Sequence, residues 1–473
     1  MKETPLHWMS AGELADTIAR GEVSAREALT SHWERIDRLN PHLNAVIYED
    51  RERAWQEAVR ADERQASGAE LGPLHGVPFT SKDSNDTAGM PTTWGSPLLK
   101  DRVPQNDSLI VARLRGAGAI LTGKNNVPEF AAGAHTFNTV FGTTRNPYDL
   151  GLSAGGSSGG VASVLAAGIQ SFGDGSDMGG SLRIPASFCN VVGLRPSRGR
   201  VPGPGADSWA WLGQTGPMAR EVSDVALLLS VIAGPDPRVP MSIPESGERF
   251  TRPLAEDLSG VRIGWAPGLG LGLPVDPRTL RVLEKALTVF EELGATVTLA
   301  APRLGEADHV FRQTRANDLE AFWGELVRAN PSQVKEEVRE NVELGRRQSS
   351  ADLRALAAAR TRVEAEVRDY FSSFDLLLAP TAQSLPFPVE ERFPQEVAGH
   401  GTPDYLDWMR SVCVVTAMDS PAISVPAGFT EQGLPVGLQI VAPHGQDLRV
   451  LDAAYAYESR THWSRHRPSI AVD

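Results

Sequence analysis

The sequence predicts an α/β layered fold, because short apolar strand-like runs alternate with longer helix-like runs along most of the chain. Its size supports this prediction: 473 residues, of which 41% are hydrophobic, can bury one large core or two modest ones. Charged residues make up 22% of the chain, as expected of a globular protein. Length alone allows about two to three domains.

The first half of the chain is expected to hold the sheet core. Residues 11–39 carry apolar positions at helical spacing and predict two helices, with Pro41 and Asn44 marking the exit. From there to Pro240, strand-like and helix-like runs alternate. The strand-like runs are AVIYE, GVPFTSKD and AILTGK, and the helix-like runs are ERAWQEAVRADER and SLIVARLRGAG.

The second half begins after a proline-rich surface connection at residues 235–252. A strand (VRIGWA), a capped amphipathic helix ending at Gly294 and a second strand (TVTLAA) predict a βαβ unit. Residues 306–370 predict a solvent-facing helical lobe that shapes an entrance. The closing runs DLLLAPTA, AISVPAGF and GLQIVAP and a final helix return the chain to the sheet.

Charge and composition exclude several classes of function. The net charge of −13 repels polyanions, so we expect no nucleic-acid partner. No run approaches the ~18 apolar residues of a membrane span, and the N-terminus lacks a signal-peptide pattern, so we expect a cytoplasmic protein. Cys189 and Cys413 are expected to be small core residues. No His/Cys/Asp cluster has ligand spacing, so we predict no metal and no organic cofactor.

Residues 151–200 are unusually rich in glycine and serine, which indicates tight backbone geometry or close approach to a ligand. A flexible linker does not fit, because the apolar runs VASVLAAGI and SFCNVVGL interrupt the segment. A phosphate loop does not fit, because no Lys-Ser or Lys-Thr pair follows the glycines. A nucleophile elbow fits GxSxG at GGSSG and GSSGG, but the preceding segment is turn-rich and its acid and histidine partners can only be guessed.

The Gly/Ser segment resembles the signature of the amidase signature family, a Gly-Gly-Ser-Ser-Gly stretch followed by a Gly-Gly-Ser-Ile-Arg-like stretch. Here these are residues 155–160 and 179–183. The resemblance extends to GVPFTSKDSNDTAGMPTTWGS, LTGKNNVPEFAAG, TTRNPYD and VVGLRPSRGRVP, and to the C-terminal SPAISVPAGF and GLPVGLQIV. It covers nearly the whole chain and is weakest over residues 306–401.

The resemblance implies one large α/β domain over residues 1–473, built on a mixed, twisted sheet of about eleven strands flanked by helices. The signature core spans about residues 70–240, and a more variable helical lobe at about 303–370 lies near the active-site entrance. It also implies a catalytic triad of Lys82, Ser157 and Ser181, with Ser157 following a cis peptide bond.

The implied chemistry is amide hydrolysis through an acyl-enzyme on Ser181, with Ser157 passing the proton to Lys82. A lysine acts as a base only when neutral, so its pKa must fall from about 10.4. Burial in a sheet core without a facing carboxylate is the available cause. Asp83 follows directly, but adjacent strand residues point to opposite faces.

The oxyanion hole is expected from the backbone N–H groups of Met178, Gly179, Gly180 and Ser181. Ser158, Ser176, Asp177 and Arg183 are expected to hold the loop, although local turn chemistry explains them equally well. The candidate pocket residues are Ala131, Gly133, His135, Trp209 and Trp211. For His135 a structural role is favoured, because the triad is complete without it, and the tryptophans also suit core packing.

The predicted function is that of an amidase acting on small to medium apolar or aryl amides, with esters, carbamates or urethanes, and aminohexanoate-type oligoamides as further candidates. A monomer or homodimer is expected. The alternative is the amidase component of a tRNA-dependent amidotransferase complex, which requires partner proteins. A catalytically dead binding protein is disfavoured by the intact triad.

Overall fold

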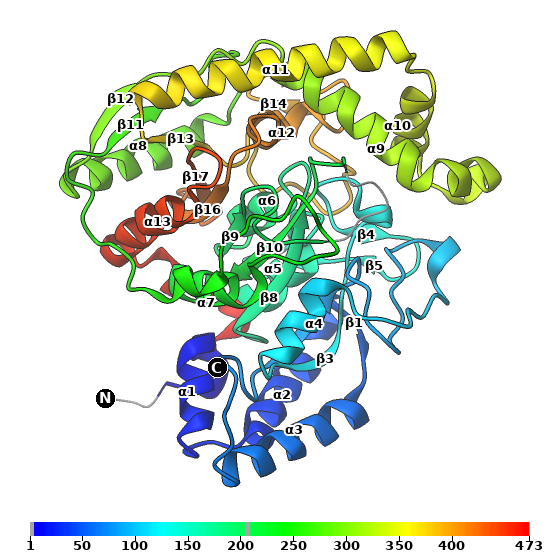
Figure 1. The fold of residues 1–473 in the computed structure, drawn as a ribbon, viewed down its shortest axis with the longest axis vertical. Helices are drawn as coiled ribbons and strands as arrows, with labels where there is room; N and C mark the ends of the chain where they lie inside the picture. Colours follow the sequence, from blue (N-terminus) through cyan, green and yellow to red (C-terminus); the bar gives the residue numbers. More distant parts are fainter. Residues whose placement is uncertain (1–3, 204–208, 473) are drawn as a thin grey trace.

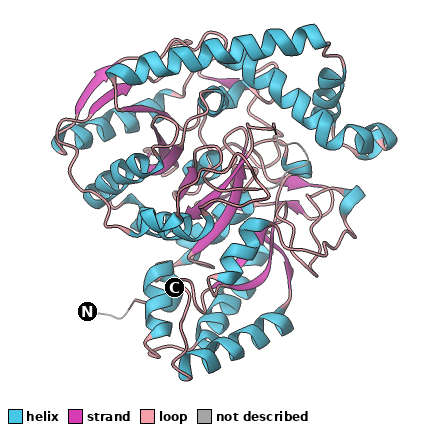
Figure 2. Ribbon diagram, viewed as in Figure 1, coloured by secondary structure: helices cyan, strands magenta, loops and turns pink. Residues whose placement is uncertain are grey.

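The computed structural model describes residues 4–203 and 209–472 and is centred on a mixed eight-stranded sheet (Figures 1 and 2). The strand order is β12-β11-β13-β17-β16-β9-β10-β8. β11 is parallel to β12 and β13, and the other neighbours are antiparallel. The strands are β8 (Phe172–Asp177), β9 (Val192–Arg195), β10 (Gln214–Ala219), β11 (Arg262–Trp265), β12 (Thr296–Leu299), β13 (Leu376–Pro380), β16 (Ala422–Phe429) and β17 (Pro435–Val441). The predicted α/β class with a mixed sheet is confirmed.

The expected eleven strands are divided between two sheets. β1 (Val46–Glu49), β3 (Ile120–Asn125) and β2 (Pro78–Lys82) form a separate three-stranded sheet. β2 lies beside β8, but side chains replace the backbone ladder there. The N–H of Thr80 donates to Oε1 of Gln170 at 2.9 Å, and the N–H of Lys82 donates to Oδ1 of Asp174 at 3.1 Å. These acceptors satisfy the backbone of β2 without a strand-to-strand ladder.

Helices cover both faces of the eight-stranded sheet. One face packs against α7 (Val222–Ile232), α8 (Pro277–Glu292) and α13 (Asp447–Thr461), which form one apolar core with the strands. The opposite face packs against α5 (Gly159–Ala166), α6 (Arg183–Phe188) and α12 (Arg410–Ala417). The parallel β11–α8–β12 unit is confirmed.

Four helices surround the three-stranded sheet at the N-terminal end of the molecule (Figure 1). They are α1 (Ala11–Ala19), α2 (Ala25–Leu43), α3 (Arg51–Ala66) and α4 (Leu109–Gly116). Ser10 and Ser24 begin α1 and α2 with capping boxes, which explains the two helices predicted there. Pro41 lies inside the last turn of α2, and Asn44 ends that helix in the left-handed conformation.

Three helices form the predicted lobe at the far end of the molecule from α1–α3: α9 (Ala307–Ala329), α10 (Glu336–Arg346) and α11 (Ser350–Ser373) (Figure 1). The lobe is less solvent-facing than predicted. Val310 and Phe311 of α9 and Val363 of α11 are buried in one core with α12 and β13. α9 thus lies close to the Gly/Ser segment, because a Cβ on Gly179 would approach the Phe311 ring to 3.0 Å.

Six two- to five-residue strands form small hairpins outside the main sheets: β4 (Phe137–Asn138), β5 (Gly142–Thr143), β6 (Arg145–Asn146), β7 (Asp149–Ser153), β14 (Glu396–Val397) and β15 (His400–Gly401). The expected surface connection at 235–252 contains only a short 3₁₀ helix at Gly247–Thr251. Among the described residues, none of the helices combines the length and apolar character needed to cross a bilayer. Both cysteines are free and buried, as expected.

Candidate active site

Lys82 is the last residue of β2, a strand whose residues are all buried, and its side chain is fully enclosed. Its Nζ donates to three serine hydroxyls: Ser157 Oγ at 2.8 Å, Ser158 Oγ at 2.9 Å and Ser176 Oγ at 2.9 Å. Three donors on three oxygens complete the hydrogen bonding of an ammonium group. A neutral amine donates two bonds and accepts one, so in that form it is able to take the hydroxyl proton of Ser157.

Burial lowers the pKa of Lys82 to about 7, although the carboxylates of Asp177 and Asp174 act in the opposite direction. The expectation of a lysine without a facing carboxylate is therefore wrong in detail: two carboxylates lie nearby, and desolvation outweighs them. Asp83 points elsewhere. Its carboxylate accepts bonds from the N–H and hydroxyl of Thr93, at 3.0 and 2.5 Å. A large fraction of Lys82 is neutral near pH 7.

The paired serines lie next to Ser181. The Gly156–Ser157 peptide bond is cis, and Ser157 is buried. The N–H of Ser158 donates to the carbonyl of Ser181 at 3.2 Å, which joins the two Gly/Ser loops. Ser181 is 8% exposed. Only glycine fits at position 156, since a Cβ there would lie 2.9 Å from the backbone nitrogen of His135. The structure thus brings the three sequence-predicted residues into one region.

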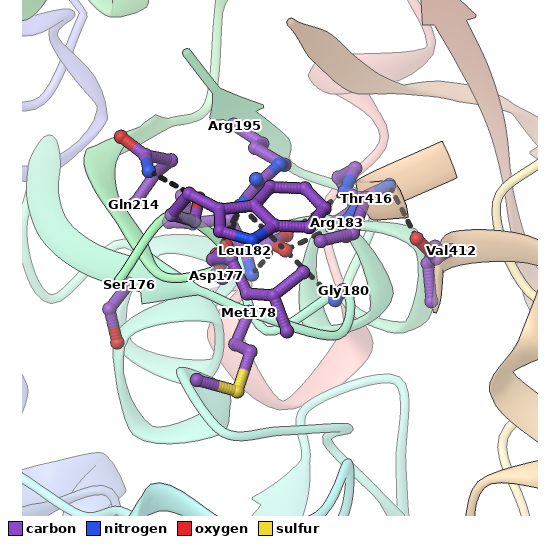
Figure 3. A network of polar contacts seen from close by, with 12 residues as sticks. Ser176, Asp177, Met178, Gly180, Leu182, Arg183, Arg195, Gln214, Val412 and Thr416 are labelled. Atoms are coloured by element: carbon purple, nitrogen blue, oxygen red, sulfur yellow. Dashed lines mark hydrogen bonds and ion pairs between the residues drawn. The ribbon is translucent and has the colours of Figure 1, made fainter. Parts of the chain in front are cut away.

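The carboxylate of Asp177 organises the loop that carries Ser181 (Figure 3). It forms a buried, two-pronged ion pair with Arg183, with distances of 2.8 and 3.0 Å. Its oxygens also accept the N–H groups of Gly180 at 2.9 Å and Leu182 at 3.1 Å. Burial favours a higher pKa for Asp177, but Arg183 outweighs this effect and holds the pKa well below its usual range. Asp177 is therefore a permanent anion.

Arg183 and Arg195 extend this network to neighbouring elements. Arg183 also donates to Oε1 of Gln439 at 2.5 Å, and to Thr416 Oγ1 at 2.8 Å. Arg195, on β9, donates to the carbonyl oxygens of Asp177 and Leu212. The sequence interpretation named Asp177 and Arg183 but not Arg195. The signal available for it was an arginine inside the buried strand run VVGLR, which requires an anionic or carbonyl partner.

The geometry corrects one member of the expected oxyanion hole. The N–H of Gly180 is occupied, because it donates to Asp177. The N–H groups of Met178, Gly179 and Ser181 have no acceptor among the described residues. These three donors belong to the turn between β8 and α6, and they are the ones available to an oxyanion.

Two further residues of this region have roles that the sequence interpretation did not assign. Ser176 was expected to hold the loop, but it is the third hydroxyl bound to Lys82. Asp174 was not named at all. Its carboxylate accepts from Ser81 Oγ and Asn85 Nδ2, both at 2.6 Å, and from the N–H of Lys82. The only signal was an acidic residue in the otherwise small-residue run GDGS.

His135 and Trp211 are structural residues. His135 is buried between Ser153 Oγ at 2.7 Å and the carbonyl of Val389 at 3.1 Å, and burial lowers its pKa to about 4. Trp211 is 5% exposed and packs in the core, and the Arg360 guanidinium lies 3.9 Å from its ring centroid. Neither ring is free to line a pocket.

The remaining pocket candidates have different surroundings. Trp209 is 84% exposed. Ala131 and Gly133 lie in the loop after β3, where both have positive φ angles, 52° and 106°. Lys335 of the helical lobe donates its ammonium to the carbonyl of Ala132 in this loop. The loop is thereby attached to the lobe.

Comparisons with known proteins place the chain in a family. The Amidase family model matches residues 27–451. The chain belongs to the amidase family. An acylamidase from Rhodococcus erythropolis is 37% identical over 482 residues, covering 100% of this chain and 99% of that protein. The amidase component of a glutamyl-tRNA(Gln) amidotransferase from Moorella thermoacetica is 36% identical, covering 99% of each.

The structure of this amidase is similar to that of a bacterial aryl acylamidase of the amidase signature family. The TM-score is 0.92, with 31% identity and 99% of each chain covered. The sequence-based resemblance is confirmed. This amidase is accordingly an enzyme that hydrolyses carbon–nitrogen bonds of small-molecule amides.

Proposed function

We propose that this amidase cleaves acyl amides of arylamines through an acyl-enzyme on Ser181, with Ser157 and Lys82 as the proton relay. One observation carries the proposal: a fully buried lysine with a pKa lowered to about 7 is bonded at 2.8 Å to the hydroxyl of Ser157. A neutral amine at this position is a base of the strength that catalysis near neutral pH requires.

In the first step Ser181 Oγ attacks the amide carbonyl carbon. Its proton passes to Ser157 Oγ while the Ser157 proton passes to the neutral Nζ of Lys82. The N–H groups of Met178, Gly179 and Ser181 stabilise the negative oxygen of the tetrahedral intermediate. The relay then runs backwards: Lys82 returns a proton through Ser157 to the leaving nitrogen, the carbon–nitrogen bond breaks, and the amine departs. Water repeats the sequence on the ester and releases the acid.

The substrate class is supported by two relatives with complementary coverage. An acylamidase is the relative at 37% identity, and an aryl acylamidase has the structure at a TM-score of 0.92. Esters, carbamates and oligoamides remain further candidates, because the same acyl-enzyme chemistry serves them. The aromatic pocket expected from Trp209 and Trp211 is not part of the proposal, since Trp211 is buried in the core.

The test uses the purified chain without partners and N-acetyl-4-nitroaniline as substrate. We expect release of nitroaniline, and we expect Ser181→Ala to reduce kcat by at least about 10³-fold, as for other serine hydrolases. Cys413→Ser is a matched control, since this buried thiol has no step in the relay. Activity of Ser181→Ala within tenfold of the wild type would refute the assignment.

The relatives that belong to amidotransferases favour one alternative, a chain that works only with partner proteins. Full activity of the isolated chain decides against it. We propose a cytoplasmic monomer or homodimer, without a nucleic-acid partner, on the basis of the net charge of −13.

We also propose that residues 1–473 act as one amidase signature domain, with α9–α11 at the entrance. This rests on the contact of Lys335 with the 129–135 loop and on the burial of Phe311 beside Gly179.

A further inference from the structure

Arg315 lies in the middle of α9, and its guanidinium reaches the loop of the nucleophile. It is 6% exposed. Its Nε and Nη2 donate to the hydroxyl of Tyr405, at 3.1 and 2.8 Å, and its Nη1 contacts Sδ of Met178 at 3.1 Å. Met178 opens the turn that carries Ser181 and contributes one of the N–H groups proposed for the oxyanion.

The charge of Arg315 lacks a direct counterion. In the described part of the chain, no carboxylate lies within ion-pair distance of it, whereas Arg312, one turn earlier, pairs with Asp308, Asp404 and Asp407. A buried guanidinium without a carboxylate is costly, and a thioether is a weak acceptor. The Nη1 bond to Met178 is therefore one that a better acceptor would replace.

The surroundings of Arg315 increase the positive charge. The ammonium of Lys335 lies close enough that, after burial and the opposing carboxylates, Arg315 contributes to the lowered pKa of that lysine. Asn341 of α10 donates its Nδ2 to the same Tyr405 hydroxyl at 3.2 Å. Tyr405 thus receives bonds from two side chains and is fixed in place, which keeps the guanidinium plane in one orientation.

We propose that Arg315 binds a carboxylate of the substrate, which takes the place of the Met178 thioether, so that this enzyme prefers amides that carry a second, anionic group. The proposal rests on the proposed function, since it places this group beside the acyl-enzyme serine. Met178 and Ser181 are three residues apart, so their Cα atoms are at most about 10 Å from each other. The preferred substrates are therefore short, such as monoamides of dicarboxylic acids.

The primary experiment compares matched substrates with the wild-type protein. N-glutaryl-4-nitroaniline and N-pentanoyl-4-nitroaniline have acyl chains of equal length, and only the first carries a terminal carboxylate. A second pair, N-acetyl-4-aminobenzoate and acetanilide, places the carboxylate on the leaving group. We expect kcat/KM to be at least about tenfold higher for the anionic member of one pair.

Variants then assign the preference to Arg315. Arg315→Met is expected to lower kcat/KM for the preferred anionic substrate by about 10- to 100-fold and to change that for its neutral partner less than threefold. Arg312→Met, the same change one turn away, is expected to leave the ratio unaltered. Arg315→Lys keeps the charge and is expected to retain part of the preference, which provides a second measurement if the methionine variant folds poorly.

The outcomes separate this inference from the proposed function. Hydrolysis of neutral anilides with no preference for either carboxylate overturns the role of Arg315 and leaves the relay intact. A preference that survives in both Arg315 variants overturns it as well. Failure to hydrolyse any anilide contradicts the proposed function itself.

Discussion

Among single residues, the exclusion of water from Lys82 determines the chemistry. Its ammonium has only serine oxygens as close partners, and the carboxylates that raise its pKa are held by other groups. Asp177 is engaged by Arg183, and Asp174 by Ser81 and Asn85. The net result is a pKa of about 7.

The lowered pKa of Lys82 predicts the pH dependence of the reaction. The base must be neutral, so kcat/KM for a neutral anilide is expected to rise about tenfold per pH unit below pH 7 and to level off above it. Rates measured from pH 5 to pH 9 test this. A profile that is flat down to pH 5, or one that still rises steeply at pH 9, would rule out a neutral Lys82 as the base. Lys82→Met should be inactive at every pH.

The sequence allowed the triad to be predicted, because the family motif fixes its register. It did not allow the third hydroxyl on Lys82, Ser176, to be separated from local turn chemistry, since serine is common in turns for independent reasons. Arg315 was not predicted either. In sequence it is one of several arginines on an α9 that alternates charged and apolar residues, and only tertiary packing shows which one is buried.

Among the structural elements, the turn between β8 and α6 is the most constrained. Gly180 has φ of 88°, and a Cβ there would lie 2.4 Å from Cγ2 of Val412 on α12. The turn is therefore packed against a helix from the far end of the chain, and its N–H groups are directed by that packing and by Asp177.

Gly180→Ala is expected to disturb this turn. The left-handed conformation and the clash with Val412 together cost about 1–4 kcal/mol of stability, and kcat falls because the oxyanion donors move. Chemical denaturation and steady-state kinetics measure both effects. Gly213→Ala is the matched control, because a Cβ at that exposed glycine meets nothing within 4 Å. Equal stability and activity of the two variants would show that the turn tolerates displacement.

The predicted elements are largely present, because helix caps and apolar periodicity are local signals. The break of the sheet between β2 and β8 was not predictable. It depends on Gln170 and Asp174 accepting the edge N–H groups of β2, and such side-chain-to-backbone bonds leave no periodic pattern in the sequence.

In the whole molecule, the site forms where distant segments meet. β2 supplies Lys82, the two Gly/Ser loops supply the serines, and α9 and α12 close over the oxyanion turn. The solvent-facing character predicted for residues 303–370 failed for α9 for this reason. Its buried side chains include charged ones such as Arg315, so composition alone did not distinguish the buried face from the exposed one.

The central claim is that Ser181 is the nucleophile activated through Ser157 and Lys82, and covalent labelling tests it most directly. A fluorophosphonate reacts with an activated serine, forming an Oγ–P bond and releasing fluoride. Trypsin cleavage after Arg145 and Arg183 leaves Ser157 and Ser181 in one peptide, so fragment-ion mass spectrometry is needed to locate the label. We expect one label per chain on Ser181 Oγ and none in Lys82→Met. A label on Ser157, or unchanged labelling of Ser181→Ala, would contradict the claim.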